Sequence, residues 1–69
     1  MTRFEELMKE ARILGDNQNT EWAEDHEDRY DAFAEACESG YDEGQLTAKE
    51  FNELILTGLY DYDGDLKEE

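Results

Sequence analysis

The sequence predicts an all-α fold: a small three-helix domain over residues 1–60, with an acidic flexible tail over residues 61–69. Three observations predict it. Apolar residues recur at steps of three and four in three separate segments, which is the spacing of one helix face. Threonine followed three residues later by glutamate, a signal for a helix start, opens two of these segments. No segment alternates apolar and polar residues as a half-buried strand does, and the sequence contains no proline.

The first predicted helix begins at Thr2. Thr2 and Glu5 have the spacing of a capping box, in which each residue bonds to the other's backbone. One apolar face follows, formed by Phe4, Leu7, Met8, Ala11 and Leu14. Gly15 occupies a position where helices usually stop, and the polar segment DNQNT at 16–20 is typical of a turn.

The second predicted helix begins near residue 20 or 21, with Asn19 or Thr20 as its cap, and extends to about residue 38. Its apolar stripe consists of Trp22, His26 in part, Tyr30, Phe33, Ala34 and Cys37. The segment ESGYDEG at 38–44 contains two glycines and a Ser-Gly step, so we expect it to end the helix.

The third predicted helix begins at Thr47, which forms a second capping-box pair with Glu50. Its apolar face consists of Phe51, Leu54, Ile55 and Leu59. The tail YDYDGDLKEE that follows is short, acidic and contains glycine, so we expect it to be loosely attached, with Tyr60 and Tyr62 holding its start.

Charge is the most informative property of the chain. It has 21 acidic and six basic residues, for a net charge of −15. Such a molecule repels nucleic acids and anionic membranes, and it attracts basic surfaces. Nucleic-acid-binding proteins carry large surfaces of that kind. We therefore expect no direct contact with nucleic acid or membrane, and a nucleic-acid-binding protein or complex as partner.

The excess acid is concentrated in residues 21–43, which carry ten carboxylates and Arg29 as the single cation. On the second predicted helix the acids recur at three- and four-residue steps, away from the apolar stripe. Over residues 21–38, a helix about 25 Å long, they give roughly one carboxylate per 4 Å, close to the 3.4 Å between phosphates of one DNA strand. We predict that the partner binds Glu21, Glu24, Asp25, Asp28, Asp31, Glu35, Glu38, Asp42 and Glu43.

Such a row of like charges destabilises its own helix. Each like-charged pair at three- or four-residue spacing costs about 0.2 to 0.5 kcal/mol. Solubility alone requires a net charge of magnitude only about 2 to 8. The excess therefore favours a binding role over its alternative, a solvated face in a very soluble protein.

In size and charge the chain resembles a class of small, strongly acidic, phage-encoded DNA-mimic inhibitors, which includes anti-restriction and anti-CRISPR proteins. The resemblance is carried by the composition and spacing of EWAEDHEDRYDAFAE and GYDEG. It implies a non-enzymatic protein whose Asp and Glu side chains stand in for phosphates and block the DNA channel of a nuclease, a surveillance complex or a repair enzyme.

A second interpretation is a structural or regulatory interaction module, in which the apolar faces and Tyr41, Tyr60 and Tyr62 bind the partner and the acids only maintain solubility. Association of two copies of the chain into a homodimer is compatible with either interpretation, because small domains often add core in this way.

A third interpretation is a degenerate EF-hand-like calcium-binding protein. Residues 39–51 resemble the latter part of an EF-hand loop, with Gly44 and Glu50 in register, but Ser39 and Tyr41 replace two oxygen-rich ligands. The tail has a second candidate with ligand-like spacing, Asp61, Asp63 and Asp65, in which the glycine comes two places early. We expect no metal site and no cofactor.

Enzymatic chemistry is not expected. His26 has no evident nucleophile to activate, and Cys37 on the apolar face is typical of a small buried hydrophobe. A single cysteine allows no intrachain disulfide, and no stretch has the apolar length of a signal peptide core or a membrane span. We expect a cytoplasmic protein, in the host cell cytoplasm if the chain is phage-encoded.

Overall fold

The computed structural model describes residues 2–59, 62, 64 and 66–68, and within them the chain is all-α and contains no strand. The predicted fold class is confirmed. The helices are α1 (Arg3–Asp16), α2 (Glu21–Asp25), α3 (Glu27–Asp42) and α4 (Ala48–Gly58). Three of them are long, and α2 has only five residues.

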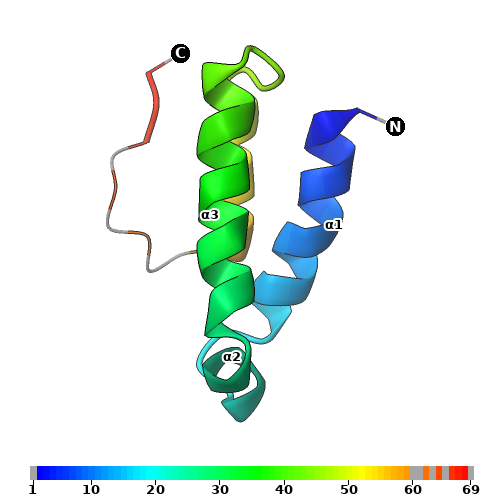
Figure 1. Ribbon diagram of the computed structural model, residues 1–69, viewed down its shortest axis with the longest axis vertical. Helices are drawn as coiled ribbons and strands as arrows, with labels where there is room; N and C mark the ends of the chain where they lie inside the picture. Colours follow the sequence, from blue (N-terminus) through cyan, green and yellow to red (C-terminus); the bar gives the residue numbers. More distant parts are fainter. Residues whose placement is uncertain (1, 60–61, 63, 65, 69) are drawn as a thin grey trace.

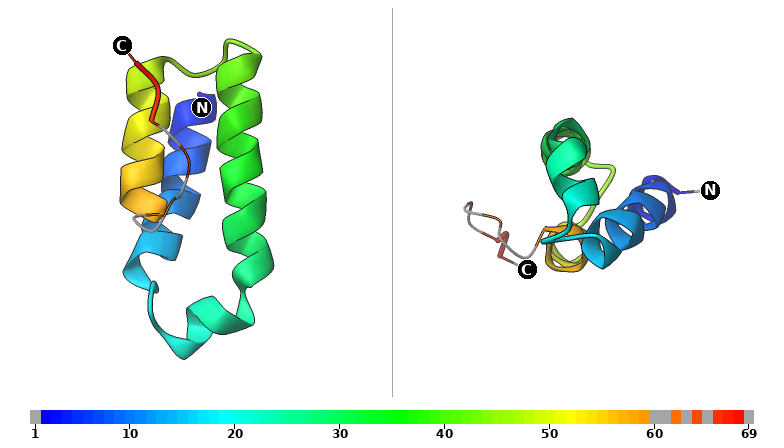
Figure 2. Two further views of the ribbon diagram at one scale, coloured as in Figure 1. Left: turned by 90° about the vertical axis from the view of Figure 1, so that its left-hand side faces the viewer. Right: turned by 90° about the horizontal axis from the view of Figure 1, so that it is seen from below.

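The three long helices pack side by side (Figure 1). α1 and α4 run in the same direction, α3 is antiparallel to both, and α2 crosses the end of the bundle between α1 and α3 (Figure 2). Residues 66–68 lie toward the end of the molecule that is opposite α2, on the side of α3 and α4 that faces away from α1.

The core is formed by the apolar stripes that the sequence predicts, together with one loop residue. Its buried members are Leu7, Ala11, Leu14, Phe33, Cys37, Leu46, Phe51, Leu54 and Ile55. Trp22 and Tyr30 are half-buried and pack at the edge of this core. Leu46 is the loop residue, and it closes the end of the core between α3 and α4.

The predicted helix starts are confirmed. The Thr2 hydroxyl accepts a hydrogen bond of 3.1 Å from the Glu5 backbone N–H at the start of α1. Thr47 and Glu50 form a complete capping box, with both reciprocal bonds present. Thr20 caps α2.

The prediction of one continuous helix over residues 21–38 is wrong, because the helix breaks at His26. The imidazole Nδ1 donates a hydrogen bond of 2.7 Å to the carbonyl oxygen of Trp22, which a continuous helix would pair with the His26 backbone N–H. That N–H bonds instead to Ala23, one residue closer. The rings of Trp22 and His26 stack with centroids 4.2 Å apart. A side chain has replaced a backbone donor, and the helix axis turns there.

The helix ends within the predicted segment 38–44, but four residues later than residue 38. α3 continues through Gly40 to Asp42 and ends in a Schellman motif. Gly44 adopts φ +79°, and the N–H of Gln45 bonds to the carbonyl of Gly40 at 2.8 Å. Gly40 is buried because Leu46 packs on it: an added Cβ would lie 2.9 Å from a Leu46 methyl carbon. The first glycine therefore serves packing, and the second provides the turn.

Gly15 also lies inside its helix rather than beyond it, since α1 ends at Asp16. An added Cβ on Gly15 would overlap the backbone carbonyl oxygen of Thr57 in α4. Near the same crossing, a Cβ on Gly58 would lie 3.1 Å from the Cα of Ala11. The two parallel helices approach this closely because both present glycine to the contact.

Candidate partner-binding surface

The acids of α3 lie on the side of the helix that faces water. At 3.6 residues per turn, six of them fall within about 100° of the helix circumference. They are Glu27, Asp28, Asp31, Glu35, Glu38 and Asp42. The core residues Phe33 and Cys37 lie on the opposite side of α3. We call these six residues the acidic row.

Eight of the nine acids predicted as binding residues are exposed, and Glu38 is half-buried. Within the described part of the chain, none of these eight forms a salt bridge. The prediction omitted Glu27, an exposed member of the acidic row. Its place on the row follows from helical spacing alone, because Glu27 lies four residues before Asp31.

Arg29, the one cation in residues 21–43, points away from the acidic row. Its guanidinium donates two hydrogen bonds to Glu10 of α1, at 3.0 Å from Nε and 2.7 Å from Nη2. It also lies over the ring of Trp22, 5.2 Å from the centroid. The hydrogen bonds to Glu10 raise the pKa of Arg29 above its ordinary value. The arginine is thus engaged by α1 and leaves the row without a cation from α3 itself.

Glu38 is the exception among the predicted acids. Its carboxylate accepts a hydrogen bond of 2.8 Å from the Tyr62 hydroxyl and forms a salt bridge of 3.3 Å with the Lys67 ammonium. Asn52 of α4 holds the same segment by exchanging two hydrogen bonds of 2.8 Å with the backbone of Lys67. Glu38 therefore serves to attach the C-terminal segment, and its charge is locally compensated.

The break at His26 divides the predicted surface in two. Glu21, Glu24 and Asp25 belong to α2, whose axis crosses that of α3 (Figure 2). The structure brings Asp28, Asp31, Glu35 and Asp42 together on one face of α3, and Glu43 caps the end of that helix. Without Glu38, five unpaired carboxylates extend over about 22 Å of α3, or one per roughly 4.5 Å. The carboxylates are thus more widely spaced than on the predicted straight 25 Å helix. The acids of α2 follow a different axis direction from those of α3.

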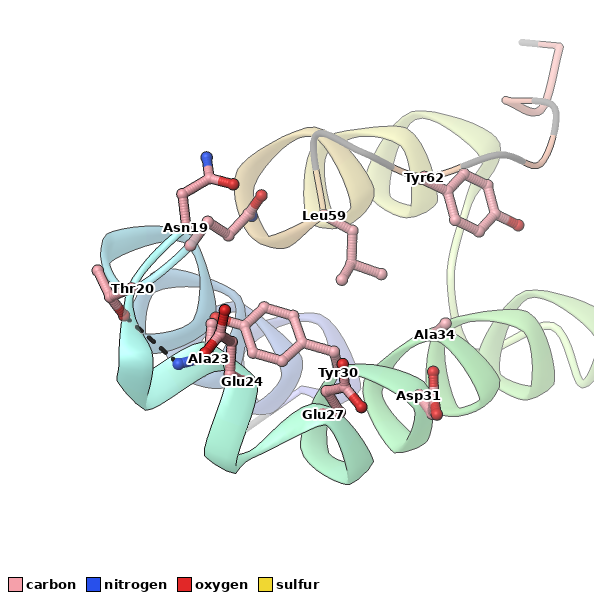
Figure 3. Close-up of a pocket in the computed structure, with 11 residues that line it drawn as sticks. Asn19, Thr20, Ala23, Glu24, Glu27, Tyr30, Asp31, Ala34, Leu59 and Tyr62 are labelled. Atoms are coloured by element: carbon pink, nitrogen blue, oxygen red, sulfur yellow. Dashed lines mark hydrogen bonds between the residues drawn. The ribbon is translucent and has the colours of Figure 1, made fainter.

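A groove opens beside the start of the acidic row, with a volume of about 720 Å³ (Figure 3). α2 and the first half of α3 form one wall, and Leu59 with Tyr62 forms the facing wall. The lining includes carboxylates from Glu24, Glu27 and Asp31. No sequence pattern predicts this groove, because Leu59 and Tyr62 are far along the chain from the α2 and α3 residues that they face.

The tyrosines predicted as exposed anchors are placed differently. Tyr41 and Tyr62 are half-buried, and both rings pack against Phe51, with centroids 5.8 Å and 6.5 Å apart. The Lys67 ammonium lies 5.2 Å from the Tyr41 centroid. These two rings are thus engaged within the molecule. Tyr60, the third predicted anchor, lies outside the described residues.

The described residues include no group of three or more His, Cys, Asp or Glu side chains that could hold a metal ion. Ser39 and Tyr41, the first and third positions of the EF-hand resemblance, are helical and precede the turn. The second calcium candidate, Asp61, Asp63 and Asp65, lies outside the described residues. Cys37 is fully buried, and burial raises the pKa of its thiol to about 12.

The fold and surface together define a class: a small all-α domain that presents to water an acidic helix face on which only Glu38 forms a salt bridge among the described residues. Comparison of the chain with protein-family models, with curated proteins and with solved structures gave no match. None of the helices in the described part is long and apolar enough to cross a membrane.

Proposed function

We propose that this protein is an acidic nucleic-acid mimic that blocks the DNA- or RNA-binding surface of a protein partner, and that it acts as a phage anti-defence protein. It binds through the acids of α2, the acidic row and Glu43. It inhibits by occupancy, because the partner's basic surface cannot hold the mimic and nucleic acid together.

The observation that carries this proposal is the contrast between two helices. On α1, Glu6 pairs with Arg3 at 3.6 Å and Glu10 pairs with Arg29 of α3 at 2.7 Å. On α3, five exposed acids share one face, and no described cation pairs with any of them. A merely soluble protein needs no such segregation, whereas a surface that must attract cations in a partner needs carboxylates that are not already paired.

The acids give the protein an electrostatic field that is strongest on one face. Like charges on one face add their fields, so a basic partner is attracted mainly to that face, and association is faster at low ionic strength. The spacing of roughly 4.5 Å along α3 is of the same order as the 3.4 Å between phosphates along one DNA strand. The acids of α2 continue the negative surface around the corner at His26.

Two variants with the same net charge test the proposal. Asp28, Asp31 and Glu35 are changed to lysine in the first, and the exposed acids Asp16, Glu53 and Glu68 are changed to lysine in the second. The partner is identified as the host protein that binds the wild type at low salt and is released from it when duplex DNA or RNA is added. Circular dichroism shows whether each variant is folded.

The proposal requires the first variant to lose capture and inhibition, and the second to keep most of both. Capture by the wild type must also fall steeply between low and high salt, because screening weakens exposed charge pairs. If both folded variants bind as the wild type does, or if both lose binding equally, the acidic row is not the binding surface.

A further inference from the structure

We propose that the groove beside α2 and α3 holds one arginine side chain of the basic partner. The proposal rests on the proposed function for the identity of the partner, but the recognition chemistry is carried by the groove itself. It assigns a defined contact within a surface that otherwise acts through its total charge.

The groove is large enough for a long side chain, and its walls offer both charged and apolar contacts. Its volume is about 720 Å³, it is open to solvent, and its lining includes Glu24, Glu27 and Asp31 (Figure 3). Leu59 projects toward Tyr30 from the facing wall, and Ala34 and Tyr62 also belong to the lining. The lining thus combines carboxylates with apolar and aromatic side chains.

Charge complementarity selects a cation as the occupant. Glu24, Glu27 and Asp31 are exposed, and none of them forms a salt bridge with a described residue. Their negative charge is therefore available to a ligand. An anion or a neutral apolar segment would meet repulsion or leave the carboxylates without a partner.

The aromatic walls favour arginine over lysine. The Tyr30 ring is fixed by its hydroxyl, which donates a hydrogen bond of 2.7 Å to the Leu14 carbonyl, and the Tyr62 ring by its bond to Glu38. A planar guanidinium stacks on such rings and offers several donors in a rigid fork to the carboxylates, whereas an ammonium is compact and strongly hydrated. Arg29 on Trp22 shows the same pairing within this molecule.

The remaining part of an arginine side chain also has a place. Its three methylene groups can lie along Leu59 and Ala34 while the charged end reaches the acids, as long basic side chains commonly do. The groove therefore matches both ends of the side chain. Because the groove is open to solvent and lies beside the acidic row, the rest of the partner can remain bound to that row.

The test is a titration of the full-length, isotope-labelled protein with N-acetyl-arginine methylamide at low salt, followed through backbone amide shifts. The lysine and citrulline analogues are the matched ligands: lysine keeps the charge and citrulline keeps the shape. The proposal requires arginine to shift the amides of residues 18–34, Leu59 and Tyr62 most, with an apparent Kd at least about threefold lower than that of lysine, the size of one exposed pair.

Variants locate the contact. Glu27→Gln and Tyr62→Leu should each raise the arginine Kd about threefold. Glu53→Gln makes the same change in net charge as Glu27→Gln but lies on α4, outside the binding surface, and should leave the Kd unchanged. Equal shifts by arginine and lysine, or shifts centred on residues 42 and 43, overturn the groove proposal. If that happens while the lysine variants of the acidic row still abolish partner capture, the proposed function stands and only the groove contact fails.

Discussion

Arg29 of α3 reaches across to α1 and holds the carboxylate of Glu10 with two hydrogen bonds, of 3.0 Å and 2.7 Å. This pair has two consequences. It ties the two helices together near the break at His26, and it removes the only cation of residues 21–43 from the acidic row. The interaction that contributes to the fold is therefore also the one that leaves the candidate binding surface uncompensated.

The first prediction concerns this pair. Arg29→Gln leaves Glu10 without its partner and removes the cation over Trp22, so the urea midpoint of unfolding should fall at low salt. The difference from the wild type should shrink in 1 M salt, because the interaction is partly exposed and is screened. Arg12→Gln, an exposed cation on α1, is the control with the same charge change. An equal loss in the control would mean that net charge alone sets the midpoint.

The second prediction concerns the capping box of α4. Thr47→Ala removes the acceptor for the Glu50 N–H, which is 3.1 Å away, and should lower the free energy of unfolding by about 1 kcal/mol. Thr47→Ser keeps the hydroxyl and should remain close to the wild type. Denaturant unfolding of both variants measures the difference. Equal losses would show that the threonine methyl group, and not the cap, matters at this position.

The third prediction reverses a common rule. Glycine to alanine inside a helix usually stabilises it by about 1 kcal/mol, but at Gly15 the new methyl group would overlap the carbonyl oxygen of Thr57. We expect Gly15→Ala to destabilise by about 2 kcal/mol, since α1 and α4 must separate. Gly40→Ala meets the flexible side chain of Leu46 and should cost less. Thermal unfolding of the two variants ranks them, and a stabilised Gly15→Ala protein would rule out the close crossing.

The helices were predictable where their signals are local. Thr2 and Thr47 start helices because each has a glutamate three residues on, and the apolar steps within each segment identify the buried face. Such signals depend only on neighbours within one or two turns. They locate elements without placing them against one another.

The features that the sequence does not predict depend on contacts between distant segments, or on a side chain that competes with the backbone for a hydrogen-bond acceptor. Nothing between residues 21 and 27 is a helix breaker, and the turn arises because the His26 ring takes the Trp22 carbonyl. Gly15 and Gly40 read as stop signals, but their neighbours Thr57 and Leu46 come from other segments and make them packing positions. The groove was hidden for the same reason, since Tyr62 is more than 20 residues from the wall it faces.

The fourth prediction concerns alkaline pH. Burial raises the pKa of Cys37 from its ordinary value of 9.0 to about 12. The unfolded chain therefore loses the thiol proton at lower pH than the folded one, and stability falls as pH rises above 9 toward 12. The loss between pH 9 and 10.5 should be about 1.6 kcal/mol from this group.

Tyrosines and lysines also titrate in this range, so the contribution of Cys37 is obtained as the difference between the wild type and a variant that lacks the thiol. Unfolding free energies of the wild type and Cys37→Ala are compared at pH 8, 9, 10 and 10.5. Cys37→Ala should start lower, because a buried group is lost, and should fall less steeply with pH. Parallel curves for the two proteins would show that the thiol remains protonated in both states or ionises equally in both.

The last prediction separates binding from stability on the acidic row. Asp31 has three acidic neighbours at helical spacing, Glu27, Asp28 and Glu35, and each like-charged pair costs about 0.2 to 0.5 kcal/mol. Asp31→Asn should therefore stabilise the protein by roughly 1 kcal/mol at low salt and weaken partner binding. Glu6→Gln makes the same change in net charge but breaks the pair with Arg3, so it should not stabilise and should leave binding intact. If Asp31→Asn lowers stability, the acids of α3 support the fold, and the argument that their repulsion is retained for binding fails.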